Sequence, residues 1–295
     1  MSSNIKAAHE FLNDLADNPP RLPFEPTLLP KLFKKLSDDN KEPLGKLVEL
    51  VEQSQGLAAK VLSIANSACY GLQGKVNSLY RAVQVLGLIE LRSLVLFFSV
   101  SEAMPRKLLP KEFPAMELWE HQIRTGMLGR QMAKTINATQ GPDGRFFDAE
   151  SIYAAGLLHD MGKVVLAYKL PDAWAEITAL SQSRGCNFAA AEDEYWGIDH
   201  GTVASILLRA WGLPELLTEM ISWHHHPALA PDYKDDVRIL AAANTLAVQG
   251  LDEEGRLPAA VLEPLPEYAP ALQADTDIFA DLLHQERAAQ IASFA

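Results

Sequence analysis

Apolar residues recur at spacings of three and four from Leu28 to the C-terminus of this chain, and the alternating pattern of a half-buried strand is almost absent. Such spacing puts the apolar side chains of a segment on one helical face, which has to be buried against another helix. With 295 residues, 48% of them hydrophobic, the chain can bury a sizeable core. The sequence therefore predicts an all-α, multi-helical protein.

Charge and cysteine content narrow the class of protein. The formal net charge of −12 repels a phosphate backbone, and no basic stripe alternates with aromatic residues, so we expect no direct binding of nucleic acid. The N-terminus lacks the apolar region of a signal peptide, and the longest apolar run, 94–100, is too short to cross a membrane. Cys69 and Cys186 lie in unrelated contexts. We therefore expect a cytoplasmic protein without membrane contacts.

An amino-terminal helical lobe is expected over residues 22–105. Ser78 is a suitable N-cap for a helix that runs to about Leu86, and Gly87 would end it. Three apolar stripes before it predict further helices, over residues 28–36, 44–51 and 57–65.

A second lobe, residues 114–250, contains most of the histidines. Gly212-Leu213-Pro214 predicts the end of one helix and the start of the next. Residues 251–295 are expected to form an extended connection, rich in Pro, Glu and Ala to about Asp275, and a docked C-terminal helix. The apolar stripe of that last helix consists of Ile278, Phe279, Leu282 and Leu283.

A histidine and an aspartate stand side by side, His159 and Asp160, inside an apolar helical pattern. Burying an imidazole and a carboxylate among leucines and valines is costly unless hydrogen bonds, an opposite charge or a cation compensates. The simplest compensation without a metal is an ion pair between Asp160 and Lys163, three residues later.

Further polar residues occupy apolar-face positions in four other predicted helices: His121, His200, the pair His224 and His225, and Asn244. Taken singly, each histidine is more often a core residue with satisfied hydrogen bonds, and Asn244 a buried amide bonded to backbone. Taken together, several inward imidazoles and one carboxylate match the way helical bundles build dinuclear metal centres. Such a set suits iron, zinc, manganese or nickel better than calcium.

These residues resemble the HDOD domain of bacterial signalling proteins, a relative of the HD-superfamily phosphohydrolases and the HD-GYP phosphodiesterases. The resemblance spans about 22–250. In the amino-terminal lobe it is carried by Ala59-Lys60-Val61-Leu62, Ala65-Asn66-Ser67-Ala68-Cys69-Tyr70-Gly71 and Ala82-Val83-Gln84-Val85-Leu86-Gly87. In the second lobe it is carried by Trp119-Glu120-His121, Gly156-Leu157-Leu158-His159-Asp160-Met161-Gly162-Lys163, His200-Gly201, Trp211-Gly212-Leu213-Pro214, Trp223-His224-His225-His226-Pro227 and Ala243-Asn244.

The resemblance implies a ligand set for one or two divalent transition-metal ions, with iron ranked before zinc, manganese and nickel. The residues that resemble the ligands of the first site are His121, His159 and Asp160. Those that resemble the second-site ligands are His200, His224 and His225, with Asp160 as the bridge. Lys163 resembles the lysine that meets a phosphate or biases the bound water.

Two departures from the related enzymes weaken the catalytic interpretation. Asn244, a neutral and weak ligand, stands where the HD superfamily has a late aspartate. Pro227-Ala228-Leu229 follows the histidine pair in place of the Gly-Tyr-Pro signature, so the resemblance gives little support for cyclic dinucleotide hydrolysis.

Two functions remain open, and so does a site that holds no metal. The favoured function is a signal-transduction output or adaptor protein that engages signalling partner proteins and carries an HD-type metal site. The alternative is a metal-dependent phosphohydrolase or phosphodiesterase, in which Asp160 and Lys163 would be catalytic and Arg124 would help neutralise substrate charge. In a site without metal, the histidines would hydrogen-bond one another and Asp160, and the stability of the core would respond to pH.

Overall fold

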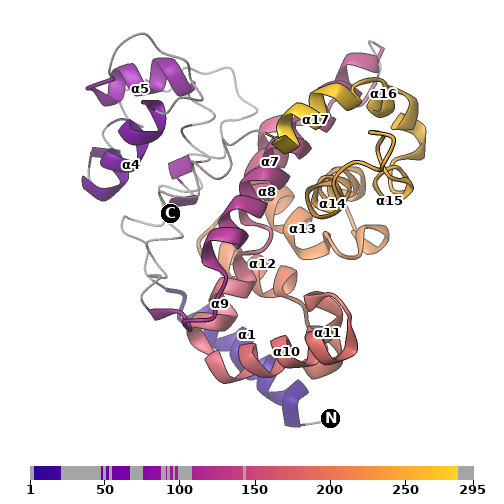
Figure 1. Cartoon of the computed structure of the whole chain (residues 1–295). Coiled ribbons are helices and arrows are strands. Elements are labelled where there is room, and N and C mark those ends of the chain that lie inside the picture. Colours follow the sequence, from indigo (N-terminus) through magenta and orange to yellow (C-terminus); the bar gives the residue numbers. More distant parts are fainter. Residues whose placement is uncertain are drawn as a thin grey trace.

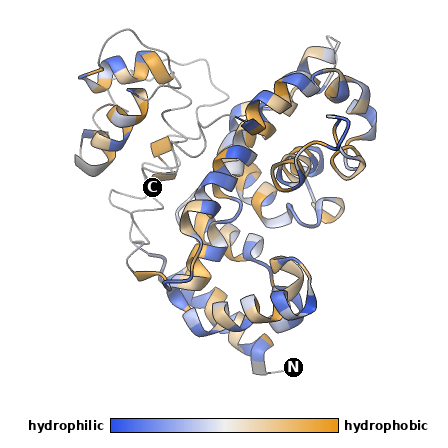
Figure 2. Cartoon of the chain, viewed as in Figure 1, coloured by the Kyte–Doolittle hydropathy of each residue, from blue (hydrophilic) through white to orange (hydrophobic). Residues whose placement is uncertain are grey.

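The computed structural model describes residues 3–20, 48, 51–52, 55–66, 76–87, 91, 94–95, 97–98, 108–141 and 144–284. All regular secondary structure in these residues is helical (Figure 1), which confirms the all-α prediction. Among these residues, no helix is both long and apolar enough to cross a membrane. Figure 2 shows hydrophobic and hydrophilic residues on most helices, as expected for amphipathic helices that share a core.

The described helices run from α1 near the N-terminus to α17. They are α1 (Ser3–Asp17), α4 (Gln55–Ala65), α5 (Leu79–Leu86), α7 (Ala115–Thr139), α8 (Ala149–Leu158), α9 (Met161–Lys169), α10 (Pro171–Arg184), α11 (Phe188–Trp196), α12 (His200–Ala210), α13 (Glu215–Trp223), α14 (Lys234–Gln249), α15 (Ala259–Leu262), α16 (Ala269–Ala274) and α17 (Thr276–His284). Two short 3-10 helices are η3 (Pro227–Leu229) and η4 (Pro266–Tyr268).

Helix α7 is a packing centre for helices of the predicted second lobe and of the segment that follows it. It is 25 residues long, and α8, α14, α16 and α17 all pack against it (Figure 1). Helix α8 is buried on every side, because its residues Ser151 to Leu158 all lie in the core. A helix with no exposed face fits the continuous apolar run that the sequence shows there.

Two glycines bring α12 close to its neighbours. A Cβ on Gly162, in α9, would lie only 1.9 Å from the backbone oxygen of His200. A Cβ on Gly201, in α12, would lie 2.6 Å from the backbone oxygen of Ile221 in α13. Only a residue without a side chain permits such contacts. The start of α12 is therefore held between α9 and the end of α13.

Within the predicted amino-terminal lobe, the structure confirms the predicted ends of α5. The Ser78 side chain accepts a hydrogen bond from the backbone N–H of Arg81, and Gly87 ends the helix with φ of 80°. Helix α4 covers the predicted stripe 57–65 and packs against α5. The predicted stripe 28–36 and most of 44–51 lie outside the described residues.

Helix α1 is an element that the sequence analysis did not assign. It packs against α11 and α12 and places Ala8 and Leu15 in the core. The ring of Phe11 stacks on that of Trp196, with centroids 5.8 Å apart. The chain segment before the predicted amino-terminal lobe thus packs against helices of the predicted second lobe.

The prediction of an extended connection over 251–275 was wrong. This stretch contains α15, η4 and α16, and it buries Val261, Leu265 and Leu272 completely. Three of its four prolines, Pro258, Pro266 and Pro270, stand at the starts of these short helices, where a missing N–H costs nothing. Helix α17 docks on α7 as predicted, but only Phe279 of its stripe is fully buried, and Ile278 is 43% exposed.

Candidate metal centre

The His159-Asp160 pair lies at a break between two helices, and not inside one continuous helix as its apolar pattern predicted. Helix α8 ends at Leu158 and α9 begins at Met161. Asp160 has φ −96° and ψ 5°, outside the helical region. The turn leaves carbonyls of the last turn of α8 without helical partners. One of them, that of Gly156, is 2.9 Å from Nδ1 of His159.

The His224-His225 pair lies at a second helix end. Helix α13 ends at Trp223, and the carbonyl of Ile221, three residues before His224, is 2.7 Å from Nδ1 of His224. The same arrangement thus occurs twice. In both cases a histidine follows a helix end and its Nδ1 meets a freed carbonyl of the last turn.

These contacts fix the tautomers of two histidines. A carbonyl oxygen can only accept, so Nδ1 of His159 and of His224 must carry the hydrogen and donate it. In the neutral imidazole, Nε2 then carries the lone pair. Both rings are fully or almost fully buried, which makes a free lone pair on each Nε2 costly unless something binds it.

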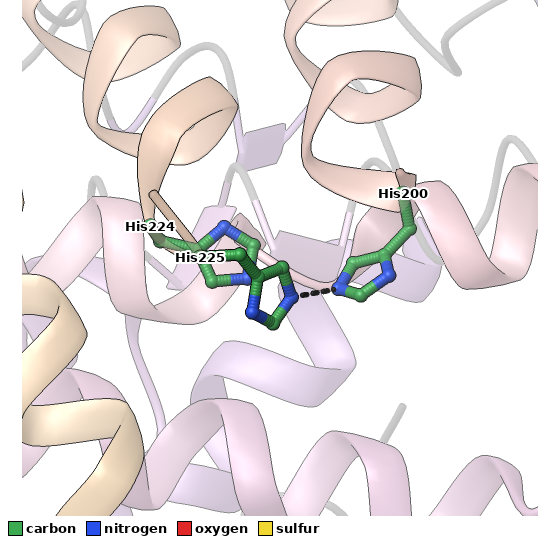
Figure 3. Close-up of side chains that lie close together, drawn as sticks. All are labelled: His200, His224 and His225. Carbon is green, nitrogen blue, oxygen red and sulfur yellow. Dashed lines mark hydrogen bonds between the residues drawn. The ribbon is translucent and has the colours of Figure 1, made fainter. Parts of the chain in front are cut away.

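The structure gathers the predicted residues into two sets. In each set the ligand atoms lie within 4.8 Å of one another. The first set is His121, His159 and Asp160, and the second set is His200, His224 and His225. Figure 3 shows the second set, with His200 at the start of one helix and the ring of His225, just past the end of another, in contact with it. These are the groups into which the family resemblance divided the residues.

Asp160 lies between the two sets. Its Oδ1 is 2.9 Å from Nε2 of His200, and its Oδ2 is 3.7 Å from Nε2 of His121. Its Oδ2 also accepts a hydrogen bond of 2.7 Å from the Lys163 ammonium, so the ion pair weighed in the sequence analysis is present. Asp160 therefore occupies the position that a bridging ligand needs, and it is partnered even without a metal.

Asn244 lies beside the first set. Asn244 and His121 line the same cavity. Burial lowers the pKa of His121, and the Asp160 carboxylate opposes that shift. The side-chain oxygen of Asn244 is buried and has no hydrogen-bond partner within the described part of the chain. An amide oxygen in this position could contact a cation, but it brings no charge to it.

Burial keeps the imidazoles neutral. It lowers the pKa of His159 to about 4 and the pKa of His224 to about 3. It also lowers the pKa of His200 well below its usual range. Although burial alone would raise the pKa of Asp160, the neighbouring imidazoles and the Lys163 ammonium hold it well below its usual range. Neutral imidazoles and an ionised carboxylate are the states that a metal ion requires of its ligands.

Glu192 in α11 is a residue of the site that the sequence analysis missed. It is completely buried, and its Oε2 lies 2.6 Å from Nδ1 of His200. Burial raises the pKa of Glu192 well above its usual range. The only available sequence signal was a buried face of α11, which the acidic run Glu192-Asp193-Glu194 obscures because such runs usually face solvent.

The two ligand sets together form a cage around Asp160. A cavity of about 950 Å³ opens onto this cage. His121, Asp160, Lys163, His200, His225 and Asn244 line its polar end. Its other walls include the aromatic rings of Phe113, Trp174 and Phe188. Arg124 does not line this cavity, and its guanidinium pairs with Glu120 instead. The cavity thus gives a small ligand access to the cage, with Lys163 as a cation on its wall.

The donor set fits a divalent transition-metal ion. Lone pairs of imidazole nitrogens converge with one ionised carboxylate, and Nε2 of His224 is buried without a hydrogen-bond partner in the described residues. Mixed nitrogen and oxygen ligands of this kind suit iron, zinc, manganese or nickel. The residues that would hold such an ion are those of the two sets.

Comparison with known proteins gives a family match over most of the chain. The HDOD domain family matches residues 22–227. A curated relative from Treponema pallidum (strain Nichols), described as an "Uncharacterized protein", is 27% identical over 241 residues. That alignment covers 81% of this chain and 44% of the relative, so the chain spans less than half of the relative's length.

Solved structures share the fold along nearly the whole chain. A "Putative phosphohydrolase" from Shewanella amazonensis SB2B has a TM-score of 0.70 at 22% identity, covering 96% of this chain and 97% of that one. An "HDOD domain protein with unknown function" from Geobacter sulfurreducens has a TM-score of 0.68 at 22% identity, covering 94% and 98%. A "Putative signal transduction protein" from Marinobacter aquaeolei VT8 has a TM-score of 0.73 at 24% identity, covering 99% of this chain and 66% of that one.

Proposed function

The chain belongs to the HDOD domain family, and on that premise we propose that it is a signal-transduction output or adaptor protein. In this proposal it engages signalling partner proteins, and the cage of histidines around Asp160 binds a divalent transition metal as a structural or sensory element. The name of the Marinobacter aquaeolei relative supports the signalling role. That relative is longer than this chain, which spans 66% of its length.

The observation that carries the proposal is the contact of Asp160 with both ligand sets, next to a neutral Asn244. Shared contact with Asp160 supports metal binding. Because the Asn244 amide is neutral, we expect the first set to bind an ion more weakly than it would with a carboxylate at that position. Lys163 donates to Asp160 at 2.7 Å, so a phosphate would have to compete with that carboxylate for the ammonium. The net charge of −12 also provides no field that gathers anionic substrates.

A second candidate is a metal-dependent phosphohydrolase, and the cavity of about 950 Å³ beside the cage favours it. The space is large enough for a phosphoester ligand of moderate size. A bound divalent ion would supply Lewis-acid chemistry there. Lys163 would neutralise phosphate charge, and Asp160 would hold the ion in place. The name of the Shewanella amazonensis relative supports this alternative.

Metal content and hydrolysis measured together distinguish the two functions. The protein is purified without added metal, and metal per chain is determined by elemental analysis. Hydrolysis of p-nitrophenyl phosphate and bis(p-nitrophenyl) phosphate is then measured for the wild type and Asp160→Asn. We expect bound metal, its loss in Asp160→Asn, and no hydrolysis by either protein.

The control is Asp252→Asn, which changes a partly exposed carboxylate that holds the turn before Arg256 and does not contact the cage. It should bind metal like the wild type. Hydrolysis that disappears in Asp160→Asn but persists in Asp252→Asn would refute the adaptor proposal and support the phosphohydrolase. Absence of metal from the wild type, including after incubation with iron or zinc salts, would refute the metal site.

A further inference from the structure

Three buried histidines of the cage have an acceptor behind the ring, but the acceptors differ in kind. For His159 and His224 the acceptor at Nδ1 is a carbonyl three residues earlier, at 2.9 and 2.7 Å. Each of these histidines follows a helix end, where carbonyls of the last turn have no helical partner. The backbone alone therefore fixes these two rings with Nε2 toward the cage.

His200 cannot be held in the same way. It is the first residue of α12, and Asp199 is the N-cap of that helix. The first turn of a helix leaves N–H groups without partners, and it has no free carbonyls to offer. The backbone N–H of His200 is itself one of these donors. This N–H needs an acceptor from another part of the chain, and so does Nδ1 if it is to carry the hydrogen as in His159 and His224.

Glu192 supplies that acceptor for both groups. Its Oε2 lies 3.0 Å from the backbone nitrogen of His200 and 2.6 Å from Nδ1. Helix α11 ends at Trp196, and Gly197, with φ of 80°, turns the chain so that α12 starts beside the Glu192 side chain. The other oxygen of Glu192 is buried without a hydrogen-bond partner in the described residues. The hydrogen bonds observed for this carboxylate both come from His200.

We propose that Glu192 is the positioning residue of the second set, which keeps the hydrogen of His200 on Nδ1 and turns Nε2 toward the cage. This proposal rests on the proposed metal site. Metal-ligating histidines commonly donate their other ring N–H to a carboxylate or a backbone carbonyl, which fixes the tautomer and the ring orientation. Glu192 does for His200 what the two carbonyls do for His159 and His224.

In this tautomer, the lone pair on Nε2 of His200 faces two neighbouring atoms. Oδ1 of Asp160 lies 2.9 Å away, and Nε2 of His225 also lies 2.9 Å away. With the hydrogen on Nδ1, the lone pair of His200 faces an acceptor oxygen and can accept only from His225. This is the arrangement in which a cation between His200 and Asp160 is most favourable.

The test compares Glu192→Leu, which removes the acceptor and fills the space, with Glu192→Gln, whose amide oxygen can still accept. Long-range ¹H–¹⁵N spectra of the metal-free proteins report the tautomer of His200, assigned by its loss in His200→Gln. We expect the hydrogen on Nδ1 in the wild type and Glu192→Gln, and on Nε2 in Glu192→Leu, where Asp160 accepts it. Zinc affinity of the second set should fall about 10- to 100-fold in Glu192→Leu and largely recover in Glu192→Gln.

The matched control is Glu219→Leu. Glu219 is also buried, and within the described residues it accepts hydrogen bonds from the backbone N–H groups of Asp232 and Tyr233, away from the cage. It should leave the His200 tautomer and zinc affinity unchanged. If Glu192→Leu does not fold, Glu192→Asp replaces it, because its carboxylate is withdrawn by one methylene from Nδ1.

The tautomer decides this proposal independently of the metal. An unchanged tautomer in the variant that removes the acceptor overturns the role of Glu192, whatever the zinc affinity. A wild type that binds no zinc, but whose His200 tautomer changes with Glu192→Leu, refutes the metal site and leaves the role of Glu192 intact.

Discussion

The two ligand sets differ in whether hydrogen bonds alone can satisfy them. In the first set, Lys163 pairs with Asp160, and Nε2 of His121 lies 3.3 Å from Nε2 of His159, to which it can donate. In the second set, His225 can donate to His200 at 2.9 Å, but Nε2 of His224 is buried without a partner among the described residues. The first set is complete as an ion pair and a histidine contact, whereas the second is not.

This difference indicates where a cation stabilises the structure most. A buried lone pair without a donor costs free energy, and a metal ion removes that cost. The first set gains less, because a metal there competes with Lys163 for Asp160. We therefore expect the first equivalent of metal to bind the second set.

The strongest test of this order removes one histidine from each set. Metal-free His224→Gln is titrated with zinc in a calorimeter, and we expect the tighter site to be lost. The affinity of that site should fall by at least about 10- to 100-fold, which is the usual effect of losing a residue that only hydrogen-bonds to a ligand. His121→Gln should lose only the weaker site and serves as the matched comparison. Loss of the tighter site in His121→Gln would reverse the order.

Acid should destabilise the metal-free protein through these histidines. The pKa of His159 is about 4 in the fold, against 6.5 in the unfolded chain, so the unfolded chain binds protons first as the pH falls below 6.5. The free energy of unfolding then decreases by about 3 kcal/mol per such histidine between pH 6.5 and about 4, at about 1.4 kcal/mol per pH unit. Thermal melting at several pH values measures this loss.

His224 sharpens the comparison, because its pKa of about 3 keeps it neutral in the fold over that whole range. His224→Gln should therefore flatten the acid dependence more than His121→Gln, whose ring is partly exposed. Equal slopes in the wild type and His224→Gln would show that this imidazole is not held neutral by burial.

Gly162→Ala should disturb the distance between the two sets, because its Cβ would lie 1.9 Å from the backbone oxygen of His200. Backbone atoms cannot rotate away, so we expect a loss of about 1–3 kcal/mol, as in overpacked cores, and a fall of several degrees in melting temperature. Gly141→Ala, with no atom within 4 Å of its Cβ, is the control and should melt like the wild type. Unchanged melting of Gly162→Ala would contradict this packing.

Asn244→Asp should bring the first set closer to the second in affinity. A carboxylate would add a negative charge beside His121, and we expect affinity at the first set to rise roughly tenfold, about 1.4 kcal/mol. Asn187→Asp is the matched control, since Asn187 lines the same cavity but its side chain caps α11. The same gain in both variants would mean that general charge, and not the position of Asn244, sets the affinity.

The apolar periodicity was enough to predict an all-α fold, but it did not locate the helix ends at the site. The pattern continues through His159 because most of α9 is buried like α8, so no change of period marks the turn. Prolines had the opposite effect in 251–275, where they suggested an extended chain although most of them begin short helices. The apolar pattern and the prolines were each compatible with two local structures, and burial against the rest of the protein decided which of the two formed.

The sequence by itself determined the helical class and the chemical types that meet at the cage, because inward polar residues on apolar faces are costly and therefore conspicuous. Only the tertiary structure decided which atoms face the cage. At two helix ends, the carbonyl three residues earlier fixes the ring orientation of His159 and of His224. Glu192 contacts the ring of His200 from another helix. Such contacts depend on where helices end and how closely they approach, and residue spacing does not specify either.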